Sequence, residues 1–269
     1  MKRGAFLVAF AFFVIPALAQ PEGTFPARIV RWMDGDTAQI RIVETPPAGI
    51  FTYETVRLLG INTPEVGEPF SEEATAYFRK LTMGKTVYVE LSPWEFRDVH
   101  SRLLAYLWVE TPEGFLMVNE ALLKEGLARL LVYFPDREKY YCRFLEALAF
   151  AQKEKKNLWG KYPEPLPLWE VEGNPLKYVL EGVTVVFEVS RVGQEREGWS
   201  LWAAQSRYGF HAILQPSPCT QVWWQSLLEG NLIGKKVAVT GELRWDSLFG
   251  GPRIVVLFPE QIQILEEEK

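Results

Sequence analysis

A proline-rich segment divides the chain into two regions. Between residues 161 and 175 the chain contains Pro163, Pro165, Pro167 and Pro175. Because proline fixes its own φ angle and has no backbone N–H, we expect this segment to be an extended linker that resists helix formation and sheet pairing. The chain has 269 residues, of which 48% are hydrophobic, and this is enough for two separate cores. The sequence therefore predicts two domains, at residues 27–160 and 176–265.

The N-terminus has the pattern of a cleavable secretory signal peptide. Lys2 and Arg3 precede an uncharged apolar stretch that ends in small residues at Ala19. This stretch is short for a membrane span, which needs about 20 apolar residues, and Pro16 would disturb a helix there. We therefore expect residues 1–19 to be removed, and the mature chain to be secreted or periplasmic and free of the membrane.

The two cysteines, Cys142 and Cys219, fall one in each predicted domain. A disulfide bond between them is possible in an oxidising compartment, but the sequence is equally compatible with buried or unpaired thiols. Their number and spacing do not match a zinc site.

Three short segments of the first region carry residues suited to phosphodiester chemistry. They read DGDTAQIRI at 34–42, RLLGINTPE at 57–65 and DVHSRLLAYLW at 98–108. Cleavage of a phosphodiester bond needs a base for the attacking water, cations for the phosphate oxygens and usually a divalent metal ion. Glu65 is a candidate base, because the preceding Pro64 stiffens the backbone that presents it. Arg57 and Arg102 offer guanidinium groups that bind phosphate bidentately.

A metal site is predicted beside the first of these segments. Asp34 and Asp36 flank Gly35 in a tight turn, where oxygen ligands of hard cations commonly converge. Together with Asn62 and Thr63, Asp36 offers oxygen atoms that suit Ca2+.

Each of these residues has an ordinary interpretation when it is considered alone. The sequence DGD is a common turn, an arginine on a strand is most often an ion-pair partner, and a glutamate after proline often caps a turn. The combination of three segments in order is what favours a catalytic site.

At these residues the chain resembles the thermonuclease family, the staphylococcal-nuclease-like domains. The shared features are the D-G-D-T turn, the R-L strand that ends in T-P-E, and the D-x-x-x-R-x-L-A-Y strand. The resemblance runs from about residue 27 to 160, through VNEALLKEGLA at 118–128 and AQKEKKNLWG at 151–160. It implies a mainly β, α+β fold in which a five-stranded OB barrel carries added helices. It also implies Ca2+-dependent hydrolysis of DNA and RNA that leaves 3'-phosphates.

The resemblance also implies roles for individual residues. By motif position, Glu65 is the general base, and Arg57 and Arg102 form the phosphate clamp. Asp36 is the carboxylate ligand of the metal ion, with the backbone carbonyl of Thr63 beside it. Asn62 stands where the family usually has a second metal-binding aspartate, so we expect weaker Ca2+ binding.

The positions that contact nucleotides depart from the family pattern. Val99 and His100 replace a basic and an aromatic residue, and Ser101 replaces a common glycine. The two tyrosines that commonly line the nucleotide pocket are replaced by Val132 and Phe134. The predicted substrate-binding residues are Phe134, Tyr133 and Lys85, with Phe134 able to stack on a base.

The second region has the strand pattern of an OB-like β-barrel domain. Strand-like runs cover 182–192, 198–205, 208–215, 235–245 and 253–265, and a helical stretch at 223–234 lies between the third and fourth runs. In the first region, 44–54 reads as a lengthened hairpin because Pro46, Pro47 and Gly49 interrupt two strand-like runs.

The charge of the chain leaves its partners open. The formal net charge is -5, and residues 161–269 hold 10 Lys and Arg against 14 Asp and Glu. Attraction for phosphate must therefore be local. The favoured function is a secreted nuclease acting on DNA, RNA or both. The alternative is a non-catalytic exported module that binds nucleic acid or protein, and for the second domain both single-stranded nucleic acid and a protein partner remain open.

Overall fold

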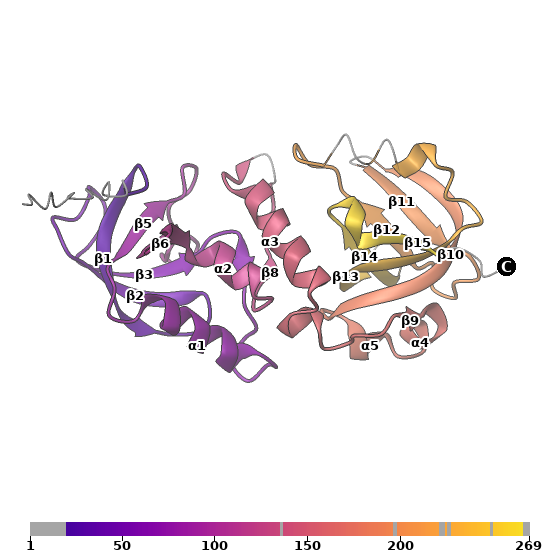
Figure 1. Cartoon of the computed structure of the whole chain (residues 1–269), viewed down its shortest axis with the longest axis horizontal. Helices are drawn as coiled ribbons and strands as arrows, with labels where there is room; N and C mark the ends of the chain where they lie inside the picture. The colour runs from indigo at the N-terminus through magenta and orange to yellow at the C-terminus, as the bar shows by residue number, and fades with distance from the viewer. Residues whose placement is uncertain are drawn as a thin grey trace, which may run out of the picture.

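The computed structural model describes residues 20–134, 137–195, 198–220, 224, 227–247 and 250–265. It consists of two β-rich domains that lie side by side, with the helix α3 between them (Figure 1). The predicted signal peptide at residues 1–19 lies outside the described residues. In the described part of the chain, no helix is long and apolar enough to cross a membrane.

In its described residues, the first domain contains a barrel and three α-helices. Its elements are β1 (Thr24–Trp32), β2 (Thr37–Ile42), β3 (Tyr53–Leu58), β4 (Ile61–Asn62), α1 (Ser71–Thr82), β5 (Val87–Leu91), β6 (Leu103–Thr111), β7 (Gly114–Met117), α2 (Val118–Lys124), β8 (Arg129–Leu130), α3 (Tyr141–Lys153) and the 3-10 turn η2 (Asn157–Trp159).

Five of these strands pair in a closed ring, and the predicted barrel is thereby confirmed. The ring runs β1, β2, β3, β6, β5 and back to β1, and only the β3–β6 pair is parallel. The predicted lengthened hairpin joins β2 to β3, which pair antiparallel. Along β2, Ala38, Ile40 and Ile42 are buried and the residues between them are exposed, as the period of two in a strand requires.

The second domain repeats this pairing scheme. Its elements are β9 (Leu166–Pro167), α4 (Leu168–Gly173), α5 (Pro175–Tyr178), β10 (Gly182–Glu195), β11 (Gly198–Ala203), β12 (His211–Leu214), β13 (Lys236–Asp246), β14 (Gly251–Val256), the 3-10 turn η3 (Pro259–Gln261) and β15 (Ile262–Leu265). Strands β10, β11, β12, β14 and β13 pair in that order, β13 returns to β10, and only β12–β14 is parallel. This order supports the OB-like interpretation of residues 176–265, which stays a prediction.

The last predicted strand, at 253–265, is divided in two by the structure. The turn η3 separates β14 from β15. Pro259 has no N–H for a strand ladder, and the side-chain oxygen of Gln261 accepts hydrogen bonds from the backbone N–H groups of Leu257 and Phe258. This side-chain contact stabilises a turn in a segment whose composition alone indicates a strand.

The proline-rich segment 161–175 is not the extended linker that was expected. Leu166 and Pro167 pair with Val185 and Val186 at the edge of the second sheet, and α4 begins directly after Pro167. Proline is tolerated on an edge strand and before a helix, because its missing N–H is not needed in either place. Val171 of α4 is fully buried in the core of the second domain, so the segment belongs to that domain.

The helix α3 joins the two domains through its two apolar faces. Phe144 and Ala147 pack in the core of the first barrel. Tyr141, Leu145, Leu148 and Ala151 belong to a separate interdomain cluster, which also contains Trp159 of η2 and Phe258 of the second domain. Cys142 and Cys219 form a disulfide bond across the same interface. The two domains are therefore held together by an apolar interface and a covalent bond.

Candidate active site

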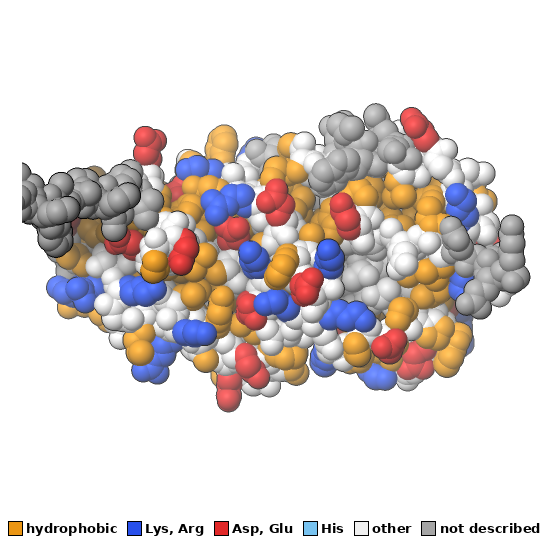
Figure 2. Space-filling model, viewed as in Figure 1, with side chains coloured by type: hydrophobic (Ala, Val, Ile, Leu, Met, Phe, Trp, Pro, Cys, Tyr) orange, Lys and Arg blue, Asp and Glu red, His pale blue; other side chains and the backbone are white. Residues whose placement is uncertain are grey.

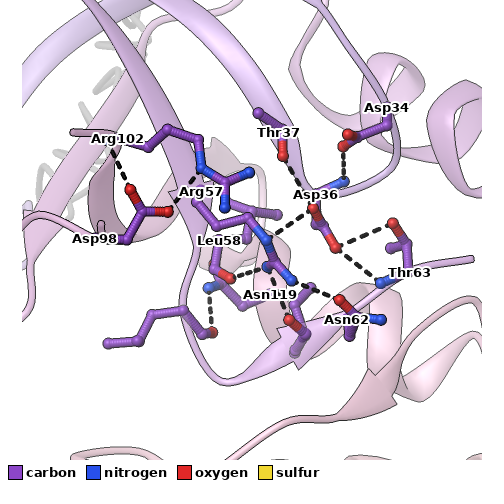
Figure 3. A network of polar contacts seen from close by, with 12 residues as sticks. Asp34, Asp36, Thr37, Arg57, Leu58, Asn62, Thr63, Asp98, Arg102 and Asn119 are labelled. Carbon is purple, nitrogen blue, oxygen red and sulfur yellow. Dashed lines mark hydrogen bonds and ion pairs between the residues drawn. The ribbon is translucent and has the colours of Figure 1, made fainter. Parts of the chain in front are cut away.

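The two predicted catalytic arginines lie on β3 and directly before β6, which are neighbours in the first barrel (Figure 3). Arg57 on β3 pairs with Thr37, the first residue of β2 and the neighbour of Asp36. Arg102 immediately precedes β6, whose first residue Leu103 pairs with Val56. Segments that are far apart in the sequence are thus brought together where the parallel pair β3–β6 begins.

The buried carboxylate of Asp36 is held by hydrogen bonds from Thr63 and Thr37. Its Oδ2 accepts bonds from the backbone N–H of Thr63 at 2.8 Å and from the Thr63 hydroxyl at 3.1 Å, and its Oδ1 accepts a bond from the Thr37 hydroxyl at 3.0 Å. Burial raises the pKa of Asp36, and the charge of Arg57 and the Thr63 N–H offset only part of this effect. An additional positive charge beside Asp36 would lower this cost of burial.

The close approach of Thr63 to Asp36 depends on Gly35. A Cβ atom at position 35 would lie 2.7 Å from the Thr63 hydroxyl oxygen and 2.7 Å from Cβ of Ala74 in α1. Close packing therefore requires glycine at position 35, in addition to the preference of the D-G-D turn for glycine.

The guanidinium of Arg57 is almost fully engaged by the protein. Its Nε lies 3.1 Å from Oδ1 of Asp36, and its Nη2 donates to Oδ1 of Asn62 at 2.7 Å. Its Nη1 donates to two backbone carbonyls, those of Leu58 at 2.5 Å and Ile61 at 2.8 Å. Arginine has five N–H donors, so these four contacts leave one donor, on Nη2, for a ligand.

Arg102 has more donors available. Its Nε donates to Oδ2 of Asp98 at 2.7 Å, while Oδ1 of Asp98 accepts the backbone N–H groups of Arg102 and His100. Burial alone would raise the pKa of Asp98, but these bonds and the charge of Arg102 lower it overall. Within the described residues both terminal nitrogens of Arg102 lack protein partners, and its side chain is 31% exposed. Arg102 can therefore present a bidentate fork to a phosphate group.

Asn119 of α2 was not singled out from the sequence, although it supports the site. It is fully buried, and its Nδ2 donates to the carbonyls of Leu59 and Ala105, while its Oδ1 accepts the backbone N–H of Leu107. These contacts tie the end of β3 to β6, where Arg57 and Arg102 are carried. The sequence of α2 gives little signal for this role, because Glu120 and Lys124 make the helix polar at other positions as well.

Glu65 lies on the loop between β4 and α1. It is exposed, and its backbone N–H donates to Oε2 of Glu68 at 3.0 Å. In the described part of the chain its carboxylate has no hydrogen bond or ion pair. Glu65 and Asn62 line the same groove, which has a volume of about 680 Å³.

The predicted metal ligands offer oxygen atoms but few charges. Among the described residues, no group of three or more His, Cys, Asp or Glu side chains is placed to hold a metal ion. Asp36, the amide oxygen of Asn62 and the carbonyl of Thr63 are hard donors that fit Ca2+ or a similar cation with water completing the shell. The raised pKa of Asp36 also fits, because a cation would offset the cost of its buried charge. Asp36 and Asn62 are both bonded to Arg57, so a cation there would share these oxygens with the guanidinium.

The predicted nucleotide-contact residues are not all at the site. Phe134 is exposed, and the guanidinium of Arg137 lies 5.0 Å over its ring and 5.7 Å over the ring of Trp94. Tyr133 is also exposed. Val132, in contrast, packs against the interdomain cluster, which explains why a residue without a polar group stands there.

Lys85 is not brought to the site by the structure. It lies in the turn before β5, whose first residue Val87 pairs with Val109 of β6. Leu103, beside Arg102, is at the other end of β6, six residues or about 20 Å away along the strand.

The comparisons with known proteins agree with this geometry. The family described as Staphylococcal nuclease homologue matches residues 55–161. A thermonuclease of Staphylococcus hyicus is 35% identical over 139 residues, which cover 49% of this chain and 75% of that protein. The endonuclease YncB of Bacillus subtilis is 31% identical over 137 residues, 49% of this chain and 60% of that protein. The SPbeta prophage-derived endonuclease YokF of the same species is 33% identical over 141 residues, 49% of this chain and 43% of that protein.

The fold and these matches together define a staphylococcal-nuclease-like OB barrel in the first half of the chain. This chain belongs to the staphylococcal nuclease homologue family.

Proposed function

We propose that this protein is a Ca2+-dependent nuclease that hydrolyses phosphodiester bonds of DNA, RNA or both. The observation that carries the proposal is the placement of Arg57 on β3, beside the buried Asp36, and of Arg102 directly before the neighbouring strand β6 (Figure 3). The names of the similar proteins, thermonuclease and endonuclease, agree with it. In this proposal the cleavage is endonucleolytic, and its products carry 3'-phosphates.

In this proposal Glu65 removes a proton from the attacking water. Its exposed carboxylate lies on the loop that follows Asn62 and Thr63, and this position supports the role. A base without a protein partner keeps its lone pairs free for that proton.

The two arginines have different tasks because their donors are engaged differently. Arg102 contributes the free fork that holds two nonbridging phosphate oxygens. Arg57 is held rigidly by its contacts with Asp36, Asn62 and two carbonyls, and it adds a single pre-aimed donor. Such fixed donors stabilise the charge that develops on the phosphate oxygens in the transition state.

Asp36, Asn62 and the carbonyl of Thr63 would hold the cation. When bound, the cation supplies positive charge close to the phosphate oxygens. Because Asn62 contributes no charge, we expect Ca2+ to bind more weakly than at a site with two carboxylates.

We further propose that the mature protein acts outside the cytoplasm, secreted or in a periplasm. The disulfide bond between Cys142 and Cys219 supports this, since such bonds persist in oxidising compartments. The apolar stretch at residues 1–19 would serve as the export signal.

The test is cleavage of single-stranded and duplex DNA and of RNA by the chain from Gln20 onward, with Ca2+ and with EDTA. Glu65→Gln is compared with Glu73→Gln, which changes an exposed carboxylate in the first turn of α1. Cleavage that requires Ca2+, is lost in Glu65→Gln and is kept in Glu73→Gln would support the proposal. A folded protein that cuts nothing with any divalent cation would favour the non-catalytic binding module.

A further inference from the structure

The groove that contains Glu65 and Asn62 is formed by both domains. The first domain contributes Leu130 and Leu131 from the segment at β8, and the second contributes Leu180, Arg244 and Trp245. The groove, of about 680 Å³, thus runs from the proposed catalytic base to a tryptophan on β13 of the other barrel. A second domain that only stabilised the first would have no need to reach the catalytic loop.

The walls of this groove are preformed by contacts between the domains. Arg129 of β8 forms an ion pair with Glu242 of β13 at 3.3 Å. The ring of Trp159 packs so closely on the start of β10 that a Cβ atom at Gly182 would lie 2.5 Å from it. A rigid groove binds a ligand without first paying the entropy of ordering its walls.

The groove is lined by three basic and four acidic side chains, and among the described residues only the carboxylates of Glu65 and Glu68 are in no ion pair. Arg244 lies 2.9 Å from the carboxylate of Glu242, which also pairs with Arg129, and Lys161 lies 2.5 Å from that of Glu181. A surface with compensated charges does not attract phosphate groups strongly. The space-filling view likewise shows basic and acidic side chains interspersed over the visible face (Figure 2).

The remaining lining favours flat apolar groups. Leucines from both domains and Trp245, which is 43% exposed, form its walls. Base faces stack on aromatic rings and tolerate apolar surroundings, whereas the bases of a duplex are already stacked and paired with each other. The observations therefore fit unpaired bases that face the groove while their phosphates face solvent.

We propose that this interdomain groove binds single-stranded nucleic acid next to the cleavage site, with Trp245 stacking on a base. The proposal rests on the proposed nuclease function, because the ligand is inferred from the fact that the groove reaches Glu65, the proposed base. It assigns the second domain a role in selecting unpaired strands. Short substrates that occupy only the site around Arg57 and Arg102 do not need the groove.

The test measures binding separately from cleavage. Fluorescence anisotropy in EDTA gives the Kd of the mature chain for labelled oligothymidylates of 20 and 3 nucleotides. Trp245→Ala is compared with Trp169→Ala, which removes a tryptophan that is 72% exposed on α4 and does not line the groove. We expect Trp245→Ala to weaken binding of the longer strand by about five- to a hundredfold, the range measured for one stacked base, and to leave the shorter one unchanged.

A second variant guards against a change in folding at β13. Leu180 lines the groove with an exposed side chain and a φ of 66°, a backbone conformation that asparagine adopts more readily than leucine. Leu180→Asn should fold normally and also weaken binding of the 20-mer. Equal binding of the 20-mer by the wild type and all three variants would overturn the proposal. A protein segment would then be favoured as the ligand of the groove.

The outcome is independent of whether the protein cuts. If Trp245→Ala does not change the Ca2+-dependent cleavage of the long strand, the proposed binding of single strands in the groove is wrong and the nuclease proposal is unaffected. If binding depends on Trp245 but the protein never cuts, the proposed role of the groove is supported and the proposed nuclease function is wrong.

Discussion

The guanidinium of Arg57 lies 3.1 Å from the carboxylate of Asp36, and the two side chains are only 11% and 7% exposed. This buried pair joins β3 to the turn before β2 and fixes both groups of the proposed site. The pair Arg102–Asp98, in contrast, is partly exposed at the start of β6. The two arginines should therefore differ in what their removal does to the protein.

Arg57→Ala should greatly reduce both stability and activity, whereas Arg102→Ala should reduce activity with little loss of stability. Loss of Arg57 leaves the buried carboxylate of Asp36 without its ion-pair partner and removes a donor from each of two carbonyls, which costs about 3–5 kcal/mol. Loss of the more exposed Arg102 costs about 1 kcal/mol or less. Each substitution should lower kcat by roughly a hundred- to a thousandfold, as removal of a preorganised donor does. Urea unfolding and cleavage kinetics on the same preparations check this; equal losses of stability would contradict the different contact sets.

Asp36→Asn should abolish stabilisation of the protein by Ca2+. A cation that binds only the folded state raises the free energy of unfolding by RT ln(1 + [L]/Kd), which is about 2.7 kcal/mol at a hundred times Kd. The wild type should therefore show a Tm that rises with Ca2+, and the variant should show none of this rise. Asp34→Asn is the matched control, because Asp34 bonds the backbone N–H of Asp36 and is not among the proposed ligands. A Ca2+ effect of equal size in Asp36→Asn would place the cation elsewhere.

The local features of the first domain could be predicted from its sequence because they rest on short segments. The turn at Gly35, the hairpin at 44–54 and the strand that carries Arg57 follow from turn residues and from alternation of apolar side chains. The pairing of β3 with β6, which brings Arg57 next to Arg102, was implied only by the family resemblance. No local rule specifies a parallel pair between segments more than 40 residues apart.

The interface between the domains could not be predicted, because its residues have ordinary patterns when each is considered alone. Val132 is interpreted from the sequence as a replaced aromatic residue, and no local pattern in α3 indicates that two of its faces are buried against different domains. The edge strand at Pro167 is not predicted from the sequence, because four prolines in 15 residues favour an extended linker, although proline is also tolerated on an edge strand. Asn119 was missed because its partners are carbonyls on strands far away in the sequence.

Ser101→Gly should stabilise the protein. Ser101 has a φ of 63°, in the left-handed region that costs a residue with a Cβ atom about 1 kcal/mol or more. Glycine removes this strain but gains entropy in the unfolded chain, so the expected net gain is about 0.5–1 kcal/mol. Ser101→Ala is the control, since it removes the hydroxyl and keeps Cβ; an equal gain in that variant would show that backbone strain is not the cause. Unfolding in urea gives both values.

Replacement of both Cys142 and Cys219 by serine should lower stability by about 2–4 kcal/mol, because the bond closes a loop with a sequence separation of 77 residues. Reduction of the wild type should produce the same loss, and reductant should have no effect on the double variant. Urea unfolding with and without dithiothreitol measures both. Equal effects of reductant on the two proteins would mean that it acts elsewhere than on this disulfide bond.

Asp98→Asn should lower stability at neutral pH, and this loss should disappear in acid. The pKa of Asp98 in the folded protein is lower than its ordinary value of 3.8, because its bonds with Arg102 and His100 outweigh its burial. A carboxylate with a lowered pKa contributes stability that is fully present above the unfolded pKa and is lost as the pH falls through the folded pKa. The difference in free energy of unfolding between wild type and variant should therefore be constant from pH 7 to about 5 and shrink below pH 4. Urea unfolding across this range checks the trend, with Glu95→Gln as an exposed carboxylate control in the same loop. A difference that persisted unchanged at pH 2 would show that Asp98 supports the turn through packing and not through its charge.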